Sequence, residues 1–438
     1  MERHIMKKLI QWKNSKKKKP LIIKGARQVG KTYIIRQFGK ENYRNVLEIN
    51  FERDLSAREI FQKTHDPKEI YEYFTYFALE ERIDQDTLLF LDEIQACRDA
   101  LTALKFIGED FPCDIICSGI LLGVAISRTS SYPVRYVEVI EMFPLSFIEF
   151  LNALDINETV LRKVFDCVKN CEPIPELLHD KMNEYFSLYM VIGGMPEVVQ
   201  EYIDSQDKKN CLRIQRAIVN DYLADMVKYS DATQAIKIRE CFDSIPLQLA
   251  KENHKFQYSM IQKGYNARYF DNSLQWLKDA GIVIQTNRLA HIDYPLKKEV
   301  ELSIFKIYMG DTGLLVSSFD NRDVLRIMQG EIGIYKGAIY ENVVSQMLKR
   351  LSINAYYYEP NQYTEIDFVI DCLDGITPIE VKAGNHTTSK SFKNFVAKYK
   401  PQYAFRLSSK NIGKDEENGI YFYPLYALEF KFDTEALN

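Results

Sequence analysis

The sequence predicts an α/β protein that begins with a parallel sheet and ends with a smaller mixed α/β segment. Two observations lead to this prediction. In the first third, short apolar runs alternate with helical stretches, which is typical of parallel strands joined by crossover helices. In the last third, short strand patterns return after a long helical stretch. The chain is therefore expected to hold several domains.

The apolar runs of the first third are predicted to be buried strands of the parallel sheet. Each run is apolar at consecutive positions, as expected for strands that helices cover on both faces. The runs are Leu21–Ile23, Val46–Phe51, Leu88–Leu91 and Asp114–Cys117. Together they assign residues 1–150 to a first domain.

The remaining chain divides by pattern into three segments. Residues 151–230 are helical without a convincing strand, which suggests a lid. Residues 231–300 end in a helix with apolar positions at i, i+4 and i+7, followed by Gly281 and an apolar strand, and this step resembles a winged helix-turn-helix. Residues 301–438 form the last segment. Its predicted strands are Ala355–Glu359, Glu365–Ile370, Pro378–Val381, Tyr403–Leu407 and Ile420–Tyr423.

Composition excludes several classes of protein. The chain has 438 residues, 46% of them hydrophobic, which excludes a disordered or collagen-like chain. Its 57 Lys and Arg residues face 61 Asp and Glu residues, a net charge of −4 that argues against chain-wide binding of nucleic acid. The eight cysteines lack paired CxxC spacing and are interpreted as reduced thiols. With no apolar run long enough to span a bilayer, a cytoplasmic protein without membrane contact is expected.

The most informative motif follows the first predicted strand. Its residues fit G-x-x-x-x-G-K-[ST] without a mismatch; they are Gly25, Ala26, Arg27, Gln28, Val29, Gly30, Lys31 and Thr32. The glycines allow the backbone N–H groups to surround phosphate oxygens, and the following helix directs its positive end toward them. Lys31 is expected to contact the β- and γ-phosphates, and Thr32 is expected to offer its hydroxyl to Mg²⁺.

An acidic pair completes the predicted phosphate site. Asp92 and Glu93 end the strand Thr87–Leu91, at the sheet edge where open α/β folds bind ligands. Asp92 is expected to hold Mg²⁺, directly or through water. Glu93 is expected to polarise the attacking water as a general base.

These motifs resemble the AAA-type ATPases of the STAND-like branch. The resemblance rests on GARQVGKT, FLDEIQ, DIICSG, EMFPLSF and GGMP, and it implies ATP and Mg²⁺ as cofactors. It places Ser118 at the sensor position, although Asn or Thr is more usual there. Arg135 is the candidate arginine finger, which would require a homo-oligomer if it acts on a neighbouring copy, and the turn at Gly193 would lie in the lid beside the nucleotide.

A second group of charged residues lies near the C-terminus. Asp367 on one predicted strand and Glu380-Val381-Lys382 on the next resemble the PD-(D/E)xK nuclease core, with Glu341 matching the acidic residue of its first helix. This resemblance implies that Asp367 and Glu380 hold a metal ion and that Lys382 orients or deprotonates water. Solvent-facing charges on ordinary strands are the alternative interpretation.

The whole chain resembles ATPases that join an N-terminal AAA domain to a C-terminal domain of uncharacterised function. The leading hypothesis is a Mg²⁺-dependent ATPase that acts as a switch over the nuclease-like segment. An ATP-regulated nuclease acting on DNA or RNA, and an ATP-gated scaffold that binds DNA or a protein partner, are the alternatives. Residues 234–294 contain eight Lys and Arg against six Asp and Glu, a balance of only +2. A DNA-binding face with Lys263, Arg268, Lys278 and Arg288 is one interpretation, and a wing-like unit that packs between domains and relays the nucleotide state is the other.

Overall fold

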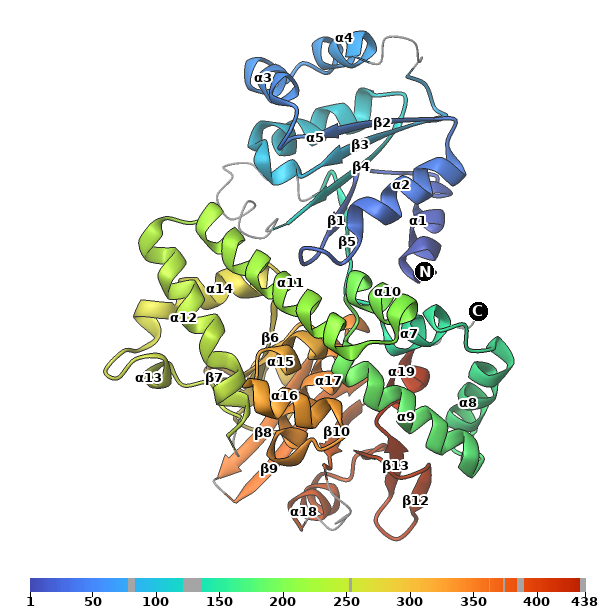
Figure 1. The fold of residues 1–438 in the computed structure, drawn as a ribbon, viewed down its shortest axis with the longest axis vertical. Coiled ribbons are helices and arrows are strands. Elements are labelled where there is room, and N and C mark those ends of the chain that lie inside the picture. Colours follow the sequence, from blue (N-terminus) through green and yellow to red (C-terminus); the bar gives the residue numbers. More distant parts are fainter. Residues whose placement is uncertain are drawn as a thin grey trace. The chain divides into compact units, whose positions relative to one another are not determined.

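The chain folds into two compact units, seen in a computed structural model (Figure 1). The N-terminal unit contains Glu2–Phe143 together with Asp279–Gly281, and the second unit contains Pro144–Lys278 and Ile282–Asn438. The structure describes residues 1–77, 83–120, 135–251, 254–361, 363–372, 375–383 and 390–433. The domain boundaries expected at residues 150, 230 and 300 stay predictions, as does the division of the second unit into lid, wing-like and terminal segments.

A five-stranded parallel sheet forms the centre of the N-terminal unit, with strand order β2-β3-β4-β1-β5. The strands are β1 (Leu21–Lys24), β2 (Asn45–Asn50), β3 (Thr87–Asp92), β4 (Asp114–Gly119) and β5 (Glu138–Glu141). The first four coincide with the predicted apolar runs, so the parallel α/β class is confirmed. Since all strands run the same way, the residues that follow β1, β3 and β4 meet at one edge of the sheet.

Helices and a 3-10 turn connect these strands. They are α1 (Ile5–Lys13), α2 (Lys31–Asn42), α3 (Leu55–Lys63), α4 (Pro67–Phe77), η1 (Ile94–Ala96) and α5 (Arg98–Asp110). Apolar side chains of α3, α4 and α5 form one buried core with those of β3 and of the residue after β2. This core includes Phe61, Phe74 and Leu104 from the helices, Leu91 from β3 and Phe51. This core fixes the carboxyl ends of the strands that carry the polar residues.

The second unit begins with a helical region, as predicted. Its helices are α7 (Phe147–Ala153), α8 (Glu158–Asn170), α9 (Glu176–Ile192), α10 (Pro196–Ser205), α11 (Lys208–Lys228), α12 (Ala232–Leu249), α13 (Tyr258–Ile261) and α14 (Ala267–Asp279). Local sequence explains several starts: Ser146 and Glu149 form a capping box at α7, and Asp231 accepts a hydrogen bond from the backbone of Gln234 at α12.

An eight-stranded mixed sheet follows, with order β12-β13-β11-β10-β9-β8-β6-β7. Its strands are β6 (Val283–Leu289), β7 (Val300–Met309), β8 (Ala355–Asn361), β9 (Thr364–Cys372), β10 (Gly375–Val381), β11 (Phe405–Ser408), β12 (Gly413–Asp415) and β13 (Ile420–Pro424). The remaining elements are η2 (Leu296–Glu299), α15 (Thr312–Ser317), α16 (Asn321–Met328), η3 (Gly333–Tyr335), α17 (Lys336–Arg350), α18 (Lys390–Tyr399) and α19 (Ala427–Phe432).

The sheet joins segments that the sequence analysis treated separately. The helix–Gly–strand step is present, with Gly281 between α14 and β6. However, β6 pairs in parallel with β8 and antiparallel with β7, so the strand expected in a wing-like unit belongs to the same sheet as the C-terminal strands.

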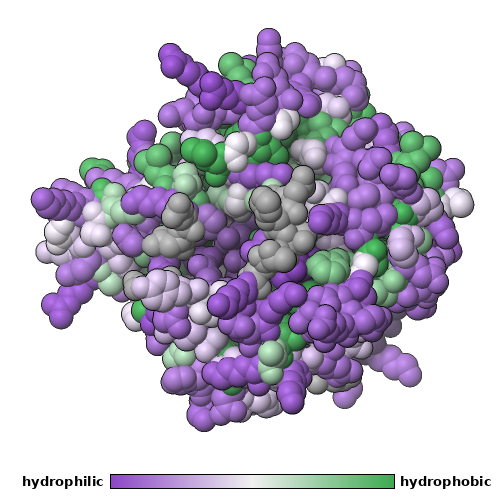
Figure 2. All heavy atoms as spheres, turned by 90° about the horizontal axis from the view of Figure 1, so that it is seen from below, coloured by the Kyte–Doolittle hydropathy of each residue, from purple (hydrophilic) through white to green (hydrophobic). Residues whose placement is uncertain are grey.

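No helix among the described residues is both long and apolar enough to cross a bilayer. The face drawn in Figure 2 is covered mainly by hydrophilic residues, and hydrophobic ones gather there only in small groups. The residues drawn in colour on this face therefore show no large apolar contact surface.

Candidate functional site

The loop between β1 and α2 has the backbone shape that its glycines predict. Gly25 has a φ of 156°, and a Cβ atom there would lie 2.2 Å from the carbonyl oxygen of Met142, so only glycine fits. Gly30 precedes α2 with a φ of 96°, in the left-handed region that other residues avoid. The loop thus ends directly at the N-terminus of α2, where backbone N–H groups favour an anion.

Lys31 and Thr32 occupy the first turn of α2. The Lys31 ammonium donates hydrogen bonds to the carbonyl oxygens of Gly25 and Ala26, at 3.0 and 2.8 Å. The side chain therefore lies along the inside of the loop, within reach of any phosphate that the loop surrounds. Thr32 directs its hydroxyl to both carboxylate oxygens of Asp92, at 3.4 and 3.3 Å.

Polar side chains from three neighbouring elements meet at Asp92, at the carboxyl edge of the sheet. This buried carboxylate ends β3 and accepts hydrogen bonds from three strands or helices: from Thr32 on α2, from Ser118 on β4, and from Asn50 on β2 at 3.0 Å. Ser118 thus contacts Asp92, and its sensor role stays a prediction. Carboxylate and hydroxyl oxygens in this arrangement are suitable ligands for Mg²⁺.

Glu93 follows Asp92 in a left-handed conformation, with a φ of 52°. This conformation is uncommon for residues other than glycine. Burial raises the pKa of Glu93 above its usual value, and the negative charge of Asp92 adds to the rise, whereas Gln95 and Lys31 oppose it. A carboxylate with a raised pKa is a stronger base at neutral pH, as a general base requires.

Sequence reasoning missed Arg3, which secures the loop from the N-terminal segment. Its buried guanidinium donates to the carbonyl oxygen of Val29 at 3.0 Å and to that of Phe143 at 2.7 Å. Nothing in the local pattern around Arg3 predicts these contacts. Asn50 was also missed, although its place at the end of a predicted strand was a usable signal.

Arg135 lies away from this edge. It is exposed, three residues before β5 begins, and β5 starts beside the first residue of β1. Its carbonyl oxygen accepts a hydrogen bond from Lys19, which also precedes β1. Arg135 is therefore at the amino end of the sheet, opposite to the loop in the same chain. An arginine-finger role would have to be exerted on another copy of the protein and stays a prediction.

The Gly193-Gly194 turn contacts Asp311 within the second unit. The Asp311 carboxylate accepts hydrogen bonds from the backbone of Gly194 at 2.7 Å and of Leu314 at 3.0 Å, and thereby caps α15. Burial raises the pKa of Asp311 to about 6, against the effect of these hydrogen bonds. The expected position of the turn beside a nucleotide stays a prediction.

The four C-terminal candidates lie in one region of the eight-stranded sheet. Glu341 is on α17, Asp367 on β9, Glu380 on β10, and Lys382 directly follows β10. Although burial acts to raise the pKa of Glu341, Lys306 and His254 hold it well below its usual value. Burial and the nearby Glu341 raise the pKa of Asp367 well above its usual value. Glu341 and Glu380 are buried, whereas Asp367 and Lys382 are half-buried.

The metal site predicted there does not fit this arrangement. Lys382 lies 2.9 Å from one oxygen of Glu380, and Arg406 donates to the other at 2.7 Å. Asp367 accepts a hydrogen bond from the backbone of Val381 at 2.7 Å. The carboxylates are thus already engaged by the chain itself.

The basic residues considered for DNA binding are partly neutralised. Arg288 forms an ion pair with Glu301 at 2.5 Å, and Lys278 donates to Gln275. Lys263 and Arg268 are exposed. This pattern does not strengthen the weak indication of a DNA-binding face.

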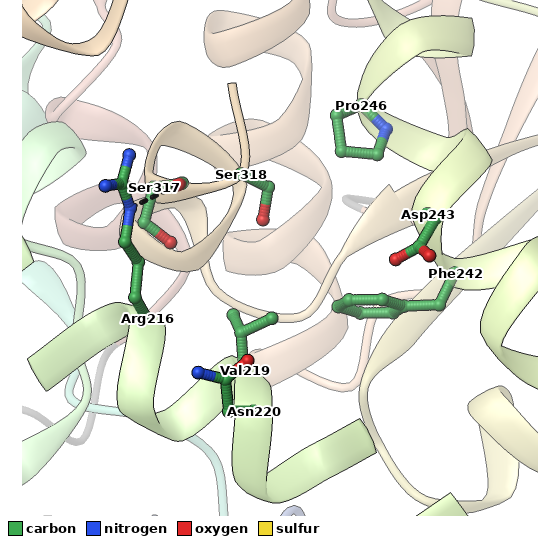
Figure 3. A pocket seen from close by; sticks show the side chains of 8 residues that line it. All are labelled: Arg216, Val219, Asn220, Phe242, Asp243, Pro246, Ser317 and Ser318. Carbon is green, nitrogen blue, oxygen red and sulfur yellow. Dashed lines mark hydrogen bonds between the residues drawn. The ribbon is translucent and has the colours of Figure 1, made fainter. Parts of the chain in front are cut away.

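A cavity of 290 Å³ lies between α11, α12 and the end of α15 (Figure 3). Its charged lining residues have partners within the chain: Arg216 donates to Asn321 at 2.6 Å, and Asp243 lies 3.5 Å from Arg239. The cavity therefore lacks the convergent polar groups of a ligand site.

Comparison with known families supports the first of these sites. Residues 17–151 match the family model described as AAA domain. Residues 183–324 and 336–428 match two models described as domains of unknown function, DUF8612 and DUF4143. No curated protein matches the chain significantly. Motif, geometry and family match agree that the N-terminal unit is a P-loop domain of the ATPase type.

Solved structures give only distant similarity. The Walker-type ATPase of Pyrococcus abyssi is 15% identical, with a TM-score of 0.43, covering 72% of this chain and 94% of its own. The ORC1 protein of Aeropyrum pernix in complex with DNA is 12% identical, with a TM-score of 0.30, covering 75% and 91%. Drosophila ORC bound to DNA is 12% identical, with a TM-score of 0.30, covering 74% and 94%. At these identities no function is transferred to this chain.

Proposed function

We propose that the N-terminal unit binds ATP with Mg²⁺, hydrolyses it slowly, and acts as a nucleotide-controlled switch on the rest of the chain. The observation that carries the proposal is the convergence of Thr32, Asn50 and Ser118 on the buried carboxylate of Asp92 beside the phosphate loop. A loop without ligand would not require four polar side chains from separate elements at one buried point.

The residues around Asp92 suit Mg²⁺. Thr32 and Asp92 would hold the ion, because a hydroxyl and a carboxylate are the hard oxygen ligands that it prefers. When bound, Mg²⁺ neutralises charge on the β- and γ-phosphates. Ser118 and Asn50 orient the Asp92 carboxylate through hydrogen bonds and so reduce the rearrangement needed on binding.

Lys31 and Glu93 act on the phosphate and on water. The Lys31 ammonium exchanges its hydrogen bonds to Gly25 and Ala26 for phosphate oxygens, which places a positive charge on the transferring group. Glu93 accepts a proton from the attacking water, a role that its raised pKa favours.

Contacts of the backbone connect the phosphate loop to the segment that joins the two units. The backbone N–H of Met142 donates a hydrogen bond to the carbonyl oxygen of Lys24 at 2.8 Å, and the Met142 carbonyl packs against Gly25. The carbonyl oxygens of Phe143 and of the loop residue Val29 both accept hydrogen bonds from Arg3. Phe143 is the last residue of the N-terminal unit before Pro144 begins the second. Rearrangement of the loop on phosphate binding therefore acts on the segment that connects the units.

The proposal is tested first by ATP titration. Lys31→Ala should abolish ATP binding, whereas Lys40→Ala, which removes an exposed lysine of the same helix, should leave it unchanged. Equal affinity in wild type and Lys31→Ala refutes the nucleotide site. Hydrogen–deuterium exchange of residues 142–147 with ATP and with ADP tests the switch separately: identical exchange in both states refutes it, even where ATP is hydrolysed.

A further inference from the structure

A row of charged residues crosses three neighbouring strands of the eight-stranded sheet. Glu380 on β10 is the registered partner of Arg406 on β11. On the other side, Ile379 pairs with Phe368 of β9, so the register continued by one residue places Glu380 opposite Asp367. Directly opposed residues point to the same face of a sheet. Arg406, Glu380 and Asp367 therefore lie side by side on one face.

The side chain of Arg406 is buried in the protein and is not exposed to solvent. Its side chain is 2% exposed, and its guanidinium lies 5.4 Å from the ring centre of Phe392 and 5.6 Å from that of Phe422. It donates from Nε to Glu380 at 2.7 Å. A buried guanidinium held between two rings cannot leave its carboxylate without exposing charge to an apolar environment.

Lys306 forms ion pairs with carboxylates of α17 and β9, as Arg406 does with Glu380. Its side chain has no exposed surface, and its ammonium lies 3.0 Å from Glu341 and 2.6 Å from Glu365. Tyr308 donates to the same oxygen of Glu341 at 2.7 Å. The ammonium thus sits between carboxylates of two different elements, which is the position that a bridging cation would occupy.

Three of the four carboxylates in this region are paired with cations of the chain. Glu341, Glu365 and Glu380 face Lys306, Lys382 and Arg406, and the fourth carboxylate, Asp367, accepts a hydrogen bond from the backbone of Val381. A divalent ion requires about six oxygen ligands at short distance. It would have to displace an ammonium or a guanidinium that is itself buried, and that group would lose its counter-charge.

We infer that the nuclease-like carboxylate face of the second unit is a closed ion-pair network, in which Lys306 and Arg406 hold the positions that a divalent metal ion would otherwise fill. The unit keeps the carboxylates of a metal site and neutralises them with its own side chains. It therefore takes up no divalent cation at this face and does not cleave nucleic acid there.

Thermal unfolding of the full chain distinguishes the two arrangements. In a metal site without metal, carboxylates repel one another, so Glu380→Gln should raise the melting temperature. In a closed network the same change leaves Arg406 buried without its partner, and the melting temperature of the second unit should fall by several degrees. Glu416→Gln removes a carboxylate that is 77% exposed and paired with Lys414, and it should change nothing.

The stability of a double variant and the binding of Mn²⁺ test the inference further. The double variant Glu380→Leu with Arg406→Leu should be more stable than either single variant, because no buried charge is left alone. Mn²⁺ binding without nucleotide, followed by electron paramagnetic resonance, should be the same in wild type and in Glu380→Gln. Mn²⁺ bound by wild type and lost in Glu380→Gln, or a melting temperature raised by Glu380→Gln, overturns the inference.

Discussion

Replacement of Arg3 by Met tests whether the phosphate loop depends on the N-terminal segment. The substitution keeps a long apolar stem but removes the two hydrogen bonds from the guanidinium to Val29 and Phe143. A hydrogen bond from a charged group contributes about 1.5–3 kcal/mol, so the loss is at least about 3 kcal/mol. For a domain of this size, that corresponds to a fall of about 10 °C in melting temperature.

The assay is thermal unfolding of wild type and Arg3→Met with and without Mg²⁺ and ATP. The transition that ATP shifts upward identifies the N-terminal unit. We also expect ATP affinity to fall about tenfold, which corresponds to about 1.4 kcal/mol, because the Val29 carbonyl must be ordered during binding.

Lys8→Met is the matched control, since it removes an exposed positive charge from the same N-terminal segment. It should change neither value. If Arg3→Met melts at the wild-type temperature and binds ATP equally well, the guanidinium does not secure the loop and the reasoning is wrong. A lower melting temperature with unchanged affinity would restrict Arg3 to a structural role.

Three further changes test other parts of the structure. Glu93→Gln should keep ATP binding but slow hydrolysis by about 100-fold or more, and the wild-type rate should fall as the pH drops through the raised pKa of Glu93. Burial raises the pKa of Asp311 from 3.8 to about 6, so the folded state binds the proton more tightly than the unfolded state. The free energy of unfolding should therefore fall as the pH rises from 4 to 7. Asp311→Asn should remove about 3 kcal/mol of this pH dependence, measured by denaturant titration at both pH values. Glu429→Gln should lower stability by about 3 kcal/mol in the same titration, because it removes the nearer of two carboxylates paired with the buried Arg350 and leaves only Asp433; an unchanged midpoint would contradict this.

Local signals account for what the sequence predicted. The parallel strands were recognised because each is a short apolar run, and the phosphate loop because its eight residues are contiguous. Asp92 could be placed at the loop because parallel strands end at one edge of the sheet. Each of these inferences needs only a short window and a rule that holds for all parallel α/β sheets.

Non-local pairing accounts for what was not predicted. Strand β7 carries Lys306 among its buried residues, so its pattern does not read as a strand of a core sheet. The pairing of β6 with β8 joins residues that are far apart in sequence, and no local pattern specifies it. Similarly, the sequence pattern indicates surface positions for Arg3 and Arg406, whose partners in the fold lie at least 26 positions away. Charged residues are usually exposed, and that prior is wrong at these positions.

The donors around each carboxylate explain why the same residue type serves different purposes in the two units. Asp92 accepts its hydrogen bonds from two hydroxyls and an amide, which are neutral and leave its charge available to a cation. Glu380 is instead bound by a guanidinium and an ammonium, which cancel its charge. A carboxylate attracts a metal ion only if its own protein has not already neutralised it. By this criterion, among the described residues, the carboxylate of Asp92 suits the proposed Mg²⁺ site at the phosphate loop, whereas that of Glu380 does not suit a metal ion.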